Sequence, residues 1–381
     1  MAGSGPVRVG VIGAGTVSDQ CLSSLTHYPD LEVVAVGDRH TERASAKAAE
    51  YDVPACGDVA SVLANDDVEI VLNLTVPAAH VEVSAAALEA GKHVWSEKPI
   101  GIERASAKAL ADLAAEKSLL LGVASDTVLA PFWQTAKRAV ESGVIGTPLS
   151  ATTLFQSQGP EWFHPSPEFL FAKGGGPLFD NGPYHLTALV HLLGPIAEVA
   201  AVGTRAQQTR HVRVGPRAGA AFPVEVPTHL AAALTFAGGA TASCLMSVDT
   251  PKFRLGVFEV NGTEGTLVLG APNMYGGTPI KVYRRWTGLP ETLEQEFETI
   301  AEPGPPSGRG VGAVAMARTL RGADLHTATG HLAYHVLDTM SAIEESAERH
   351  EFVSVTSSVD PIPSLPPDFD PFAPTLTPPA G

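Results

Sequence analysis

The chain has 381 residues, 44% of them hydrophobic, and a formal net charge of −16 at pH 7. This length is more than one small core requires and indicates two domains. The acidic balance excludes nucleic acid or an anionic membrane surface as a main partner, because phosphate recognition depends on clustered Lys and Arg.

The first informative stretch covers residues 7–18 and reads VRVGVIGAGTVS. Its β-branched residues predict a strand, and the glycines predict a tight turn into a helix. Gly13 allows the turn, and Gly15 lets a pyrophosphate approach the backbone. Helix-compatible residues begin at Ser18, and the unpaired N–H groups of the first helical turn bind anions. Thr16 and Val17 are further candidate cofactor contacts. A serine stands at the third glycine position of the dinucleotide fingerprint, so the motif is incomplete.

A second apolar strand, predicted over residues 31–36, leads to Asp38, twenty-five residues after Gly13. A carboxylate at this strand end can accept hydrogen bonds from both ribose hydroxyls of an adenosine. Arg39 could instead pair with a 2′-phosphate, but Asp38 would repel that phosphate. The sequence therefore favours NAD as cofactor and leaves NADP open.

Strands and helices continue to alternate up to residue 124, which predicts a parallel, doubly wound sheet. Ligands of such sheets lie beyond the carboxyl ends of the strands. Thr75 and Pro77 follow one strand, and His80 lies just inside the next helix. These three residues are candidates for cofactor contact, although His80 could equally cap its own helix.

A short strand over residues 93–95 leads into Ser96-Glu97-Lys98-Pro99. A lysine held by a following proline at this strand end would face the nicotinamide, with Glu97 beside the cofactor. The alternative is a surface lysine, which most lysines are. Position in the sheet favours the functional reading.

Beyond residue 146, apolar and polar residues alternate between hairpin-type turns, which predicts a largely antiparallel sheet in a second domain. One face of this sheet is apolar enough to need cover. Helices or the sheet of a second subunit could supply it, so we expect a homodimer or homotetramer.

Residues 173–185 of this second domain read KGGGPLFDNGPYH. The glycines predict a close-approach loop, Asp180 or its neighbour is predicted to cap the next helix, and Pro183 suits the first turn. Tyr184 and His185 would then lie at the helix start, where Asp180 could bond to or tune the ring beside it. The simpler alternative is a capping aspartate beside a packed tyrosine.

Proline-rich residues 356–381 should lie over a surface or stay disordered. The predicted boundaries are therefore 1–124 for a cofactor-binding domain, 125–355 for a substrate-binding and oligomerisation domain, and 356–381 for a tail. The three cysteines are widely spaced, which indicates buried thiols and no metal site. With no stretch long enough to span a membrane and no secretory leader pattern, we expect a cytoplasmic protein.

Over roughly residues 7–354 the chain resembles the Gfo/Idh/MocA oxidoreductase family. The resemblance is carried by the glycine turn, Asp38, Thr75-Val76-Pro77, Glu97-Lys98-Pro99 and the triple-glycine run. It implies an N-terminal Rossmann domain that binds NAD(P) and a C-terminal α+β domain with a large, mostly antiparallel open sheet. It also implies a reaction site lined by Lys98 and by an Asp-x-x-x-Tyr pair, Asp180 and Tyr184.

The sequence departs from the family pattern at two places. Histidine is common four residues after the aspartate, whereas this chain has Tyr184 there and His185 one residue later. Tyrosine at this position resembles the glucose-fructose oxidoreductase branch, and we favour Tyr184 over His185 as proton acceptor. Residues 124–127, ASDT, replace the more frequent Asn-x-Arg-Phe and leave the substrate open.

The function expected from this resemblance is hydride transfer between nicotinamide and a secondary or anomeric hydroxyl of a sugar, polyol or inositol. Lys98 would orient the hydroxyl, Tyr184 or His185 would relay the proton, and Asp180 would position the relay. One alternative is an NAD-dependent enzyme that cleaves glycosides by transient oxidation and elimination. Another is a non-catalytic NAD(H)-binding sensor or scaffold.

Three residues ahead of and within the glycine run are candidate sugar contacts: Trp162, His164 and Lys173. An aromatic face flanked by polar groups suits a pyranose ring. Trp162 could instead be a core residue.

Overall fold

The computed structural model describes residues 4–276, 279–286, 295–301 and 307–376. Its described residues form two compact units. The first comprises residues 4–130, 307–334 and 365–376, and the second comprises the described part of 131–301 together with 335–364. The predicted division at residue 124 differs from this arrangement, because the chain returns to the first unit twice after leaving it.

In the described part of the first unit, six parallel strands form a sheet in the order β3-β2-β1-β4-β5-β6. The strands are β1 (Val7–Ile12), β2 (Leu31–Gly37), β3 (Ala55–Gly57), β4 (Ile70–Asn73), β5 (His93–Ser96) and β6 (Leu121–Val123). The predicted doubly wound parallel sheet is confirmed. The order reverses between β1 and β4, which is where ligands of such sheets bind.

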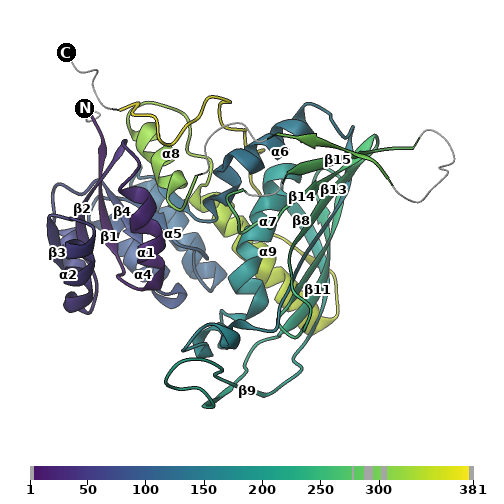
Figure 1. The fold of residues 1–381 in the computed structure, drawn as a ribbon, viewed down its shortest axis with the longest axis horizontal. Helices are drawn as coiled ribbons and strands as arrows, with labels where there is room; N and C mark the ends of the chain where they lie inside the picture. The colour runs from purple at the N-terminus through teal and green to yellow at the C-terminus, as the bar shows by residue number, and fades with distance from the viewer. Residues whose placement is uncertain (1–3, 277–278, 287–294, 302–306, 377–381) are drawn as a thin grey trace. The chain divides into compact units, whose positions relative to one another are not determined.

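Helices flank this sheet in Figure 1, among them α1, α2 and α4. The helical segments of the unit are α1 (Thr16–Leu25), α2 (Thr41–Glu50), α3 (Val59–Leu63), η1 (Pro77–Ala79), α4 (His80–Glu89), α5 (Arg104–Glu116), η2 (Asp126–Leu129) and α8 (Val311–Leu320). Buried thiols are found for Cys21 and Cys244, whereas Cys56 on the short strand β3 is exposed, contrary to expectation.

Helix α8 belongs to the first unit although the sequence placed it in the second domain. A Cβ added to Gly312 would lie 1.9 Å from Cη2 of Trp95 on β5, so only glycine allows this approach. The carboxylate of Asp126 accepts bonds from the N–H groups of Gly310, at 2.9 Å, and Gly312, at 3.2 Å. Close packing and this carboxylate cap hold α8 on the sheet.

The proline-rich tail is also held to the first unit. Asp30, with no exposed surface, accepts a bond from Nε of Arg318 at 2.7 Å and from the N–H of Leu376 at 2.8 Å. Arg318 donates in turn to the carbonyls of Asp370, at 2.8 Å, and Ala373, at 2.9 Å. Residues 365–376 of the tail therefore lie over the first unit, which agrees with one of the two expectations for the tail, whereas residues 356–364 belong to the second unit. Residues 377–381 lie outside the described part.

In the described part of the second unit, nine strands form one sheet, here called the open sheet, in the order β16-β15-β14-β13-β7-β12-β11-β8-β17. Neighbouring strands are antiparallel except β12 and β7, which are parallel. The predicted, mostly antiparallel sheet is confirmed. Its strands are β7 (Pro148–Gln156), β8 (Ile196–Thr204), β11 (His229–Phe236), β12 (Thr241–Ser247), β13 (Arg254–Gly262), β14 (Gly265–Leu269), β15 (Ile280–Arg284), β16 (Phe297–Ile300) and β17 (Val353–Ser354).

The open sheet has two different faces. Buried residues alternate along its strands, as at Ala151, Thr153 and Phe155 of β7. Helices α7 (Gly176–Leu193) and α9 (Gly330–Arg349) cover this face, and no helix of the described residues covers the other face in Figure 1. The remaining elements are α6 (Pro131–Glu141), η3 (Pro160–Trp162), η4 (Glu168–Phe171) and the paired strands β9 (Thr209–His211) and β10 (Ala221–Pro223).

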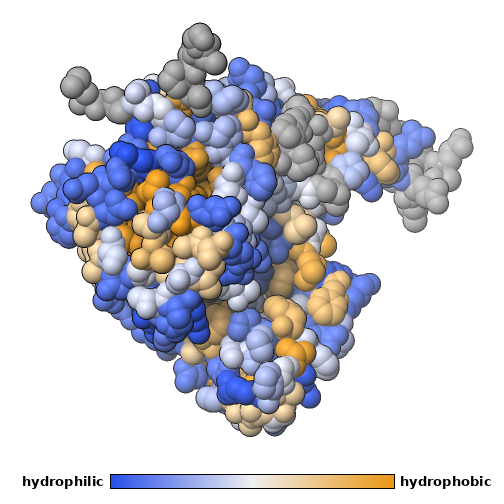
Figure 2. Space-filling model, turned by 60° about the vertical axis from the view of Figure 1, so that its left-hand side comes forward, coloured by the Kyte–Doolittle hydropathy of each residue, from blue (hydrophilic) through white to orange (hydrophobic). Residues whose placement is uncertain are grey.

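Large hydrophobic side chains are exposed at several places, including Trp162 at 50% and Phe163 at 73%. Figure 2 shows hydrophobic residues in separate patches among hydrophilic ones on the face that it draws. None of the described helices is long and apolar enough to cross a membrane.

Helix α7 begins earlier than the sequence analysis predicted. It starts at Gly176 with Gly175 as N-cap and Pro177 in the first turn, so Pro183 lies in its interior. The predicted cap at Asp180 and the predicted helix start at Tyr184 and His185 are therefore wrong. The Gly-Gly-Pro sequence supplies a helix start of its own, because proline in the first turn loses no hydrogen bond.

Glu344 of α9 makes stability depend on pH. Burial, reinforced by Glu348 and opposed by Lys173, raises the pKa of Glu344 from 4.5 to about 7. The stability that its neutral form contributes is present below pH 4.5 and is lost as the pH rises through about 7. Glu344→Gln is therefore expected to raise Tm by several degrees at about pH 8 and to change it little at about pH 5.

Thermal unfolding at the two pH values measures this effect. Glu116→Gln, which changes an exposed glutamate on α5, is the control and should leave both Tm values unchanged. A Tm gain from Glu344→Gln that is equal at both pH values would contradict the assignment.

Candidate active site

The glycine turn of the first unit leaves room for an anion. Gly13 has a φ of +110°, and a Cβ there would lie 2.7 Å from the carbonyl carbon of Leu74. Gly15 is the N-cap of α1, and a Cβ added to it would meet nothing within 4 Å. Space beside a helix N-terminus fits the pyrophosphate of a dinucleotide.

The serine in place of the third glycine is accommodated inside the turn. Ser18 is fully buried, and its hydroxyl donates to the carbonyl of Gly15 at 2.6 Å. The side chain thus folds back on its own turn and leaves the N-terminal end of α1 accessible. Helix α1 begins at Thr16, two residues earlier than the sequence predicts. Thr16 is exposed and Val17 is half-buried in this first turn.

Asp38 lies beside the glycine turn. Its Oδ2 accepts a bond from the N–H of Ala14 and its Oδ1 one from the N–H of His40, both at 2.8 Å. A carboxylate has about four acceptor positions, so capacity remains for ribose hydroxyls. Arg39 is exposed next to it.

His80 has a structural role in place of the predicted cofactor contact. The ring is buried, with Nδ1 2.6 Å from the carbonyl oxygen of Pro99 and Nε2 3.0 Å from that of Thr75. Burial lowers the pKa of His80 although both carbonyls oppose the shift. The imidazole therefore ties the end of β4 to the residue after Lys98, and it is not turned toward a ligand. Thr75 and Pro77 are half-buried at the strand end.

The Glu97-Lys98 segment is fixed at the end of β5. Glu97 accepts a bond from the backbone N–H of Lys98 at 3.2 Å, and its other oxygen pairs with Nη1 of Arg309 at 2.7 Å. Arg309 also donates through Nε to Gln20 of α1 at 2.9 Å. A residue 212 positions away in the sequence thus connects the lysine segment to the helix of the glycine turn.

Arg309 is a site residue that the sequence does not reveal. Its surroundings, Ser-Gly-Arg-Gly, resemble an ordinary loop, and no local pattern connects it with Glu97. Only tertiary packing of the segment before α8 brings the two together.

In the second unit, α7 carries the predicted proton-relay residues. Asp180 and Tyr184 are separated by one helical turn, which places them on the same face of the helix. Tyr184 is 8% exposed and Asp180 is half-buried.

His185 points into the interior of the second unit. It is 1% exposed, and its Nδ1 lies 2.5 Å from Oγ1 of Thr153 on β7. Burial lowers the pKa of His185 to about 3, so the ring is neutral at ordinary pH. This geometry favours Tyr184 of the two candidates.

The predicted sugar contacts lie in the segment between β7 and α7. Trp162 is half exposed and is therefore no core residue, and the guanidinium of Arg213 lies 5.2 Å from the centre of its ring. Nδ1 of His164 accepts a bond from the N–H of Ser166 at 3.0 Å. Lys173 is exposed. Among the described residues, no group of three or more His, Cys, Asp or Glu could hold a metal ion.

A doubly wound sheet with a dinucleotide-type glycine turn, combined with an α+β unit, defines a class of two-domain dinucleotide-binding proteins. Residues 7–125 match the domain described as "Oxidoreductase family, NAD-binding Rossmann fold", and residues 133–268 match the "GFO/IDH/MocA C-terminal domain". These two matches cover more than half of the chain, which therefore belongs to the GFO/IDH/MocA family. The first unit contains its NAD-binding Rossmann domain.

Two curated relatives are sugar oxidoreductases by name. The chain is 30% identical to dTDP-3,4-didehydro-2,6-dideoxy-alpha-D-glucose 3-reductase of Streptomyces antibioticus, over 55% of this chain and 63% of that protein. It is 32% identical to D-glucoside 3-dehydrogenase of Escherichia coli, over 50% of this chain and 55% of that one. The chain thus spans less than two thirds of the length of these relatives.

Solved structures agree with this fold. An NAD binding oxidoreductase from Klebsiella pneumoniae aligns with a TM-score of 0.80 and 23% identity, over 93% of this chain and 100% of that one. At this identity the likeness concerns the fold alone.

Proposed function

We propose that the chain is an NAD-dependent oxidoreductase that transfers a hydride between nicotinamide and a secondary ring hydroxyl of a sugar, with position 3 of a glucose-derived ring as the first candidate. The names of both curated relatives specify that position. The observation that carries the proposal is the Glu97-Lys98 segment, which is fixed at the carboxyl edge of an NAD-binding sheet and connected through Arg309 to α1.

NAD, when bound, supplies the hydride acceptor. Gly13, Gly15 and the first turn of α1 would hold its pyrophosphate, and Asp38 would bind its ribose. In this proposal Lys98 donates a hydrogen bond to the reacting hydroxyl and stabilises negative charge on the oxygen.

In this proposal the deprotonated phenolate of Tyr184 takes the proton from that hydroxyl while the hydride on the same carbon leaves for NAD, and the nearby positive charge of Lys98 and the nicotinamide favours the phenolate. Asp180, one turn earlier on the same helix, orients Tyr184. His185 has no part in the relay, because its ring is buried beside Thr153 and its lowered pKa makes it a poor proton acceptor. Trp162 offers an aromatic face to the sugar ring, with His164 and Lys173 as polar contacts.

A substrate panel tests the proposal. The purified chain is incubated with NAD and, separately, NADP, together with glucose, methyl glucosides, inositols, polyols and nucleotide-linked glucose, and NADH absorbance is followed. Oxidation of at least one glucose-derived compound is expected. Tight NADH binding without turnover of any compound would favour the sensor or scaffold alternative, and release of free sugar from a glycoside without NADH accumulation would favour glycoside cleavage.

The choice of NAD over NADP rests on Asp38. Asp38→Ser removes the carboxylate that would repel a 2′-phosphate and leaves the exposed Arg39 to attract it. The ratio of kcat/KM with NADP to that with NAD is expected to rise by about tenfold or more, since one lost charge contact corresponds to about 1.4 kcal/mol.

Steady-state kinetics with both cofactors measures this ratio. Asp66→Ser, which removes an exposed carboxylate of the same unit, serves as control and should leave the ratio unchanged. An unchanged ratio in Asp38→Ser would show that the ribose is bound elsewhere.

We also propose that the chain forms a homodimer or homotetramer through the uncovered face of the open sheet. Leu154 and Leu245 are paired on neighbouring strands of that face and are only half-buried. Light scattering after gel filtration should give a multiple of the chain mass, and Leu154→Glu should shift the protein toward monomer. A monomeric wild-type chain would contradict this proposal.

A further inference from the structure

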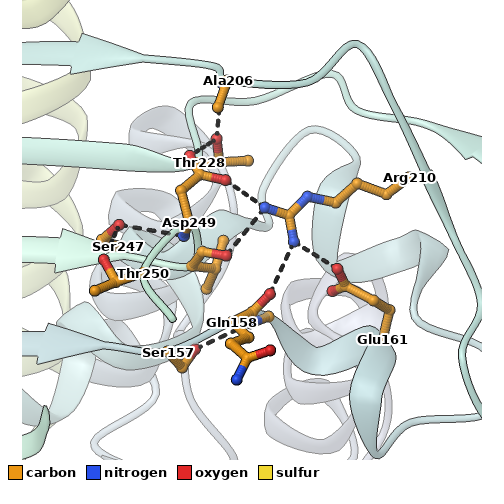
Figure 3. Close-up of polar contacts among 11 residues, drawn as sticks. Ser157, Gln158, Glu161, Ala206, Arg210, Thr228, Ser247, Asp249 and Thr250 are labelled. Atoms are coloured by element: carbon orange, nitrogen blue, oxygen red, sulfur yellow. Dashed lines mark hydrogen bonds and ion pairs between the residues drawn. The ribbon is translucent and has the colours of Figure 1, made fainter. Parts of the chain in front are cut away.

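A buried arginine connects three parts of the second unit. Arg210 of β9 is 4% exposed and donates through Nη1 to Oε1 of Glu161 at 2.6 Å and to the carbonyl of Gln158 at 3.1 Å (Figure 3). Through Nη2 it donates to the carbonyl of Val248 at 3.0 Å and to Oδ1 of Asp249. One guanidinium thus joins the segment after β7 to the end of β12.

Both acidic residues beside Arg210 make a further contact, Asp249 through its carboxylate and Glu161 through its backbone. Oδ2 of Asp249 accepts a bond from the hydroxyl of Thr228 at 2.6 Å. The side chain of Glu161 is 6% exposed. The backbone carbonyl of Glu161 accepts a bond from the backbone N–H of Arg213 at 3.1 Å. Figure 3 shows Glu161 and Asp249 approaching the guanidinium from different sides.

Such a buried network contributes more to geometry than to net stability. Desolvation of the charges offsets much of their attraction, so an apolar replacement of similar shape can be as stable. An arginine fork between two carboxylates instead fixes direction, because its donors are planar and rigid.

The segment fixed in this way, residues 157–171, carries an exposed aromatic ring. Trp162 directly follows Glu161 in η3 and is 50% exposed. The ring is supported by the guanidinium of Arg213, 5.2 Å from its centre, and the guanidinium of Arg210 lies 5.0 Å from the ring of Phe171 at the other end of the segment. An exposed tryptophan whose backbone is fixed by a buried ion network is preorganised, so that less conformational entropy is lost when a ligand binds.

We infer that Arg210 is a positioning residue for the sugar: it fixes η3 so that Trp162 forms a preformed platform for the pyranose ring. This inference rests on the proposed function, because it assigns part of the sugar affinity of that site to the position of Trp162. Arg210 itself touches no reacting group in this inference.

The test combines Arg210→Lys with Trp162→Ala. Lysine keeps the charge but cannot reach both carboxylates as a fork. Arg210→Lys is expected to raise KM for the sugar about five- to tenfold, comparable to the loss of an aromatic contact, with kcat and NADH affinity within about twofold of wild type. In the Trp162→Ala background, which has a raised KM itself, Arg210→Lys should raise KM no further.

Arg217→Lys is the matched control, because Arg217 forms an ion pair with Glu168 of the same segment but is 54% exposed. It should leave KM unchanged. Glu161→Gln, which keeps the shape of its side chain, is the second variant should Arg210→Lys fail to fold, and it should raise KM in the same direction. An unchanged KM in Arg210→Lys, or a further rise of KM in the double variant, would overturn the inference.

Hydrogen exchange without substrate separates this inference from the proposed function. Amides of residues 157–171 should exchange faster in Arg210→Lys than in wild type, while those of α7 should not change. Unchanged exchange in this segment would refute the anchoring role even in an active enzyme. A wild-type chain that oxidises no sugar would refute the proposed function instead, and the sugar-binding role of Arg210 with it, even if exchange shows the segment to be anchored.

Discussion

Lys98→Met is expected to lower kcat for sugar oxidation by a factor of about a hundred to ten thousand, while NADH affinity stays within about threefold of wild type. In the proposed reaction this ammonium group stabilises the oxygen that loses its proton, and methionine fills similar volume without a charge. The backbone of the segment should stay in place, because Glu97 accepts a bond from the backbone N–H of residue 98, which the substitution keeps.

The matched control is Lys92→Met, which removes a half-buried lysine of the same unit that donates to the carbonyl of Asn65. It should retain nearly full kcat. For both variants and the wild type, kcat is measured under saturating NAD and sugar. NADH affinity is measured by fluorescence titration. Wild-type turnover by Lys98→Met would remove Lys98 from the mechanism and leave only the NAD-binding domain assigned.

The second large effect concerns stability. Arg318→Leu is expected to destabilise the first unit by about 3–5 kcal/mol, because it leaves the fully buried carboxylate of Asp30 without its cation. The carbonyls of Asp370 and Ala373 lose their donor at the same time. For a unit of this size the loss corresponds to a fall in Tm of about 10 °C.

Urea and thermal unfolding measure this loss. Arg284→Leu is the control, since the Arg284–Glu298 pair is exposed and solvent screening leaves it little effect on stability. Equal effects of the two substitutions would mean that the Asp30–Arg318 pair does not hold the tail.

Local patterns were sufficient to predict the parallel sheet and the glycine turn of the first unit, but not the return of α8 to that unit. The strand-turn-helix around Gly13, the carboxylate at the end of β2 and the lysine after β5 are each encoded within a few residues. Helix α7 was placed wrongly because the sequence contains two possible helix starts, Gly-Gly-Pro and Asp-Asn-Gly-Pro, and local propensity does not choose between them. The structure uses the first.

Roles that depend on distant contacts could not be predicted. His80 and His185 resemble ligand-facing histidines in sequence, but Pro99 and Thr153 engage their rings in the interior. Arg309 bonds to Glu97, 212 positions away, and Arg210 bonds to Glu161, 49 positions away. Patterns among neighbouring residues cannot predict such pairs. Which polar groups pair in the interior is decided by the folded structure, so these pairs can be identified only from the structure.

The return of residues 307–334 and 365–376 to the first unit has a consequence for how the protein is made. The second unit is encoded as an insertion, so the first 130 residues leave the ribosome long before α8 and the tail that complete their unit. During that interval Trp95 lacks the glycine surface of α8, and Asp30 lacks its arginine. The cofactor-binding half therefore cannot mature in the order in which it is translated, and it reaches its final state only after the intervening unit has been synthesised.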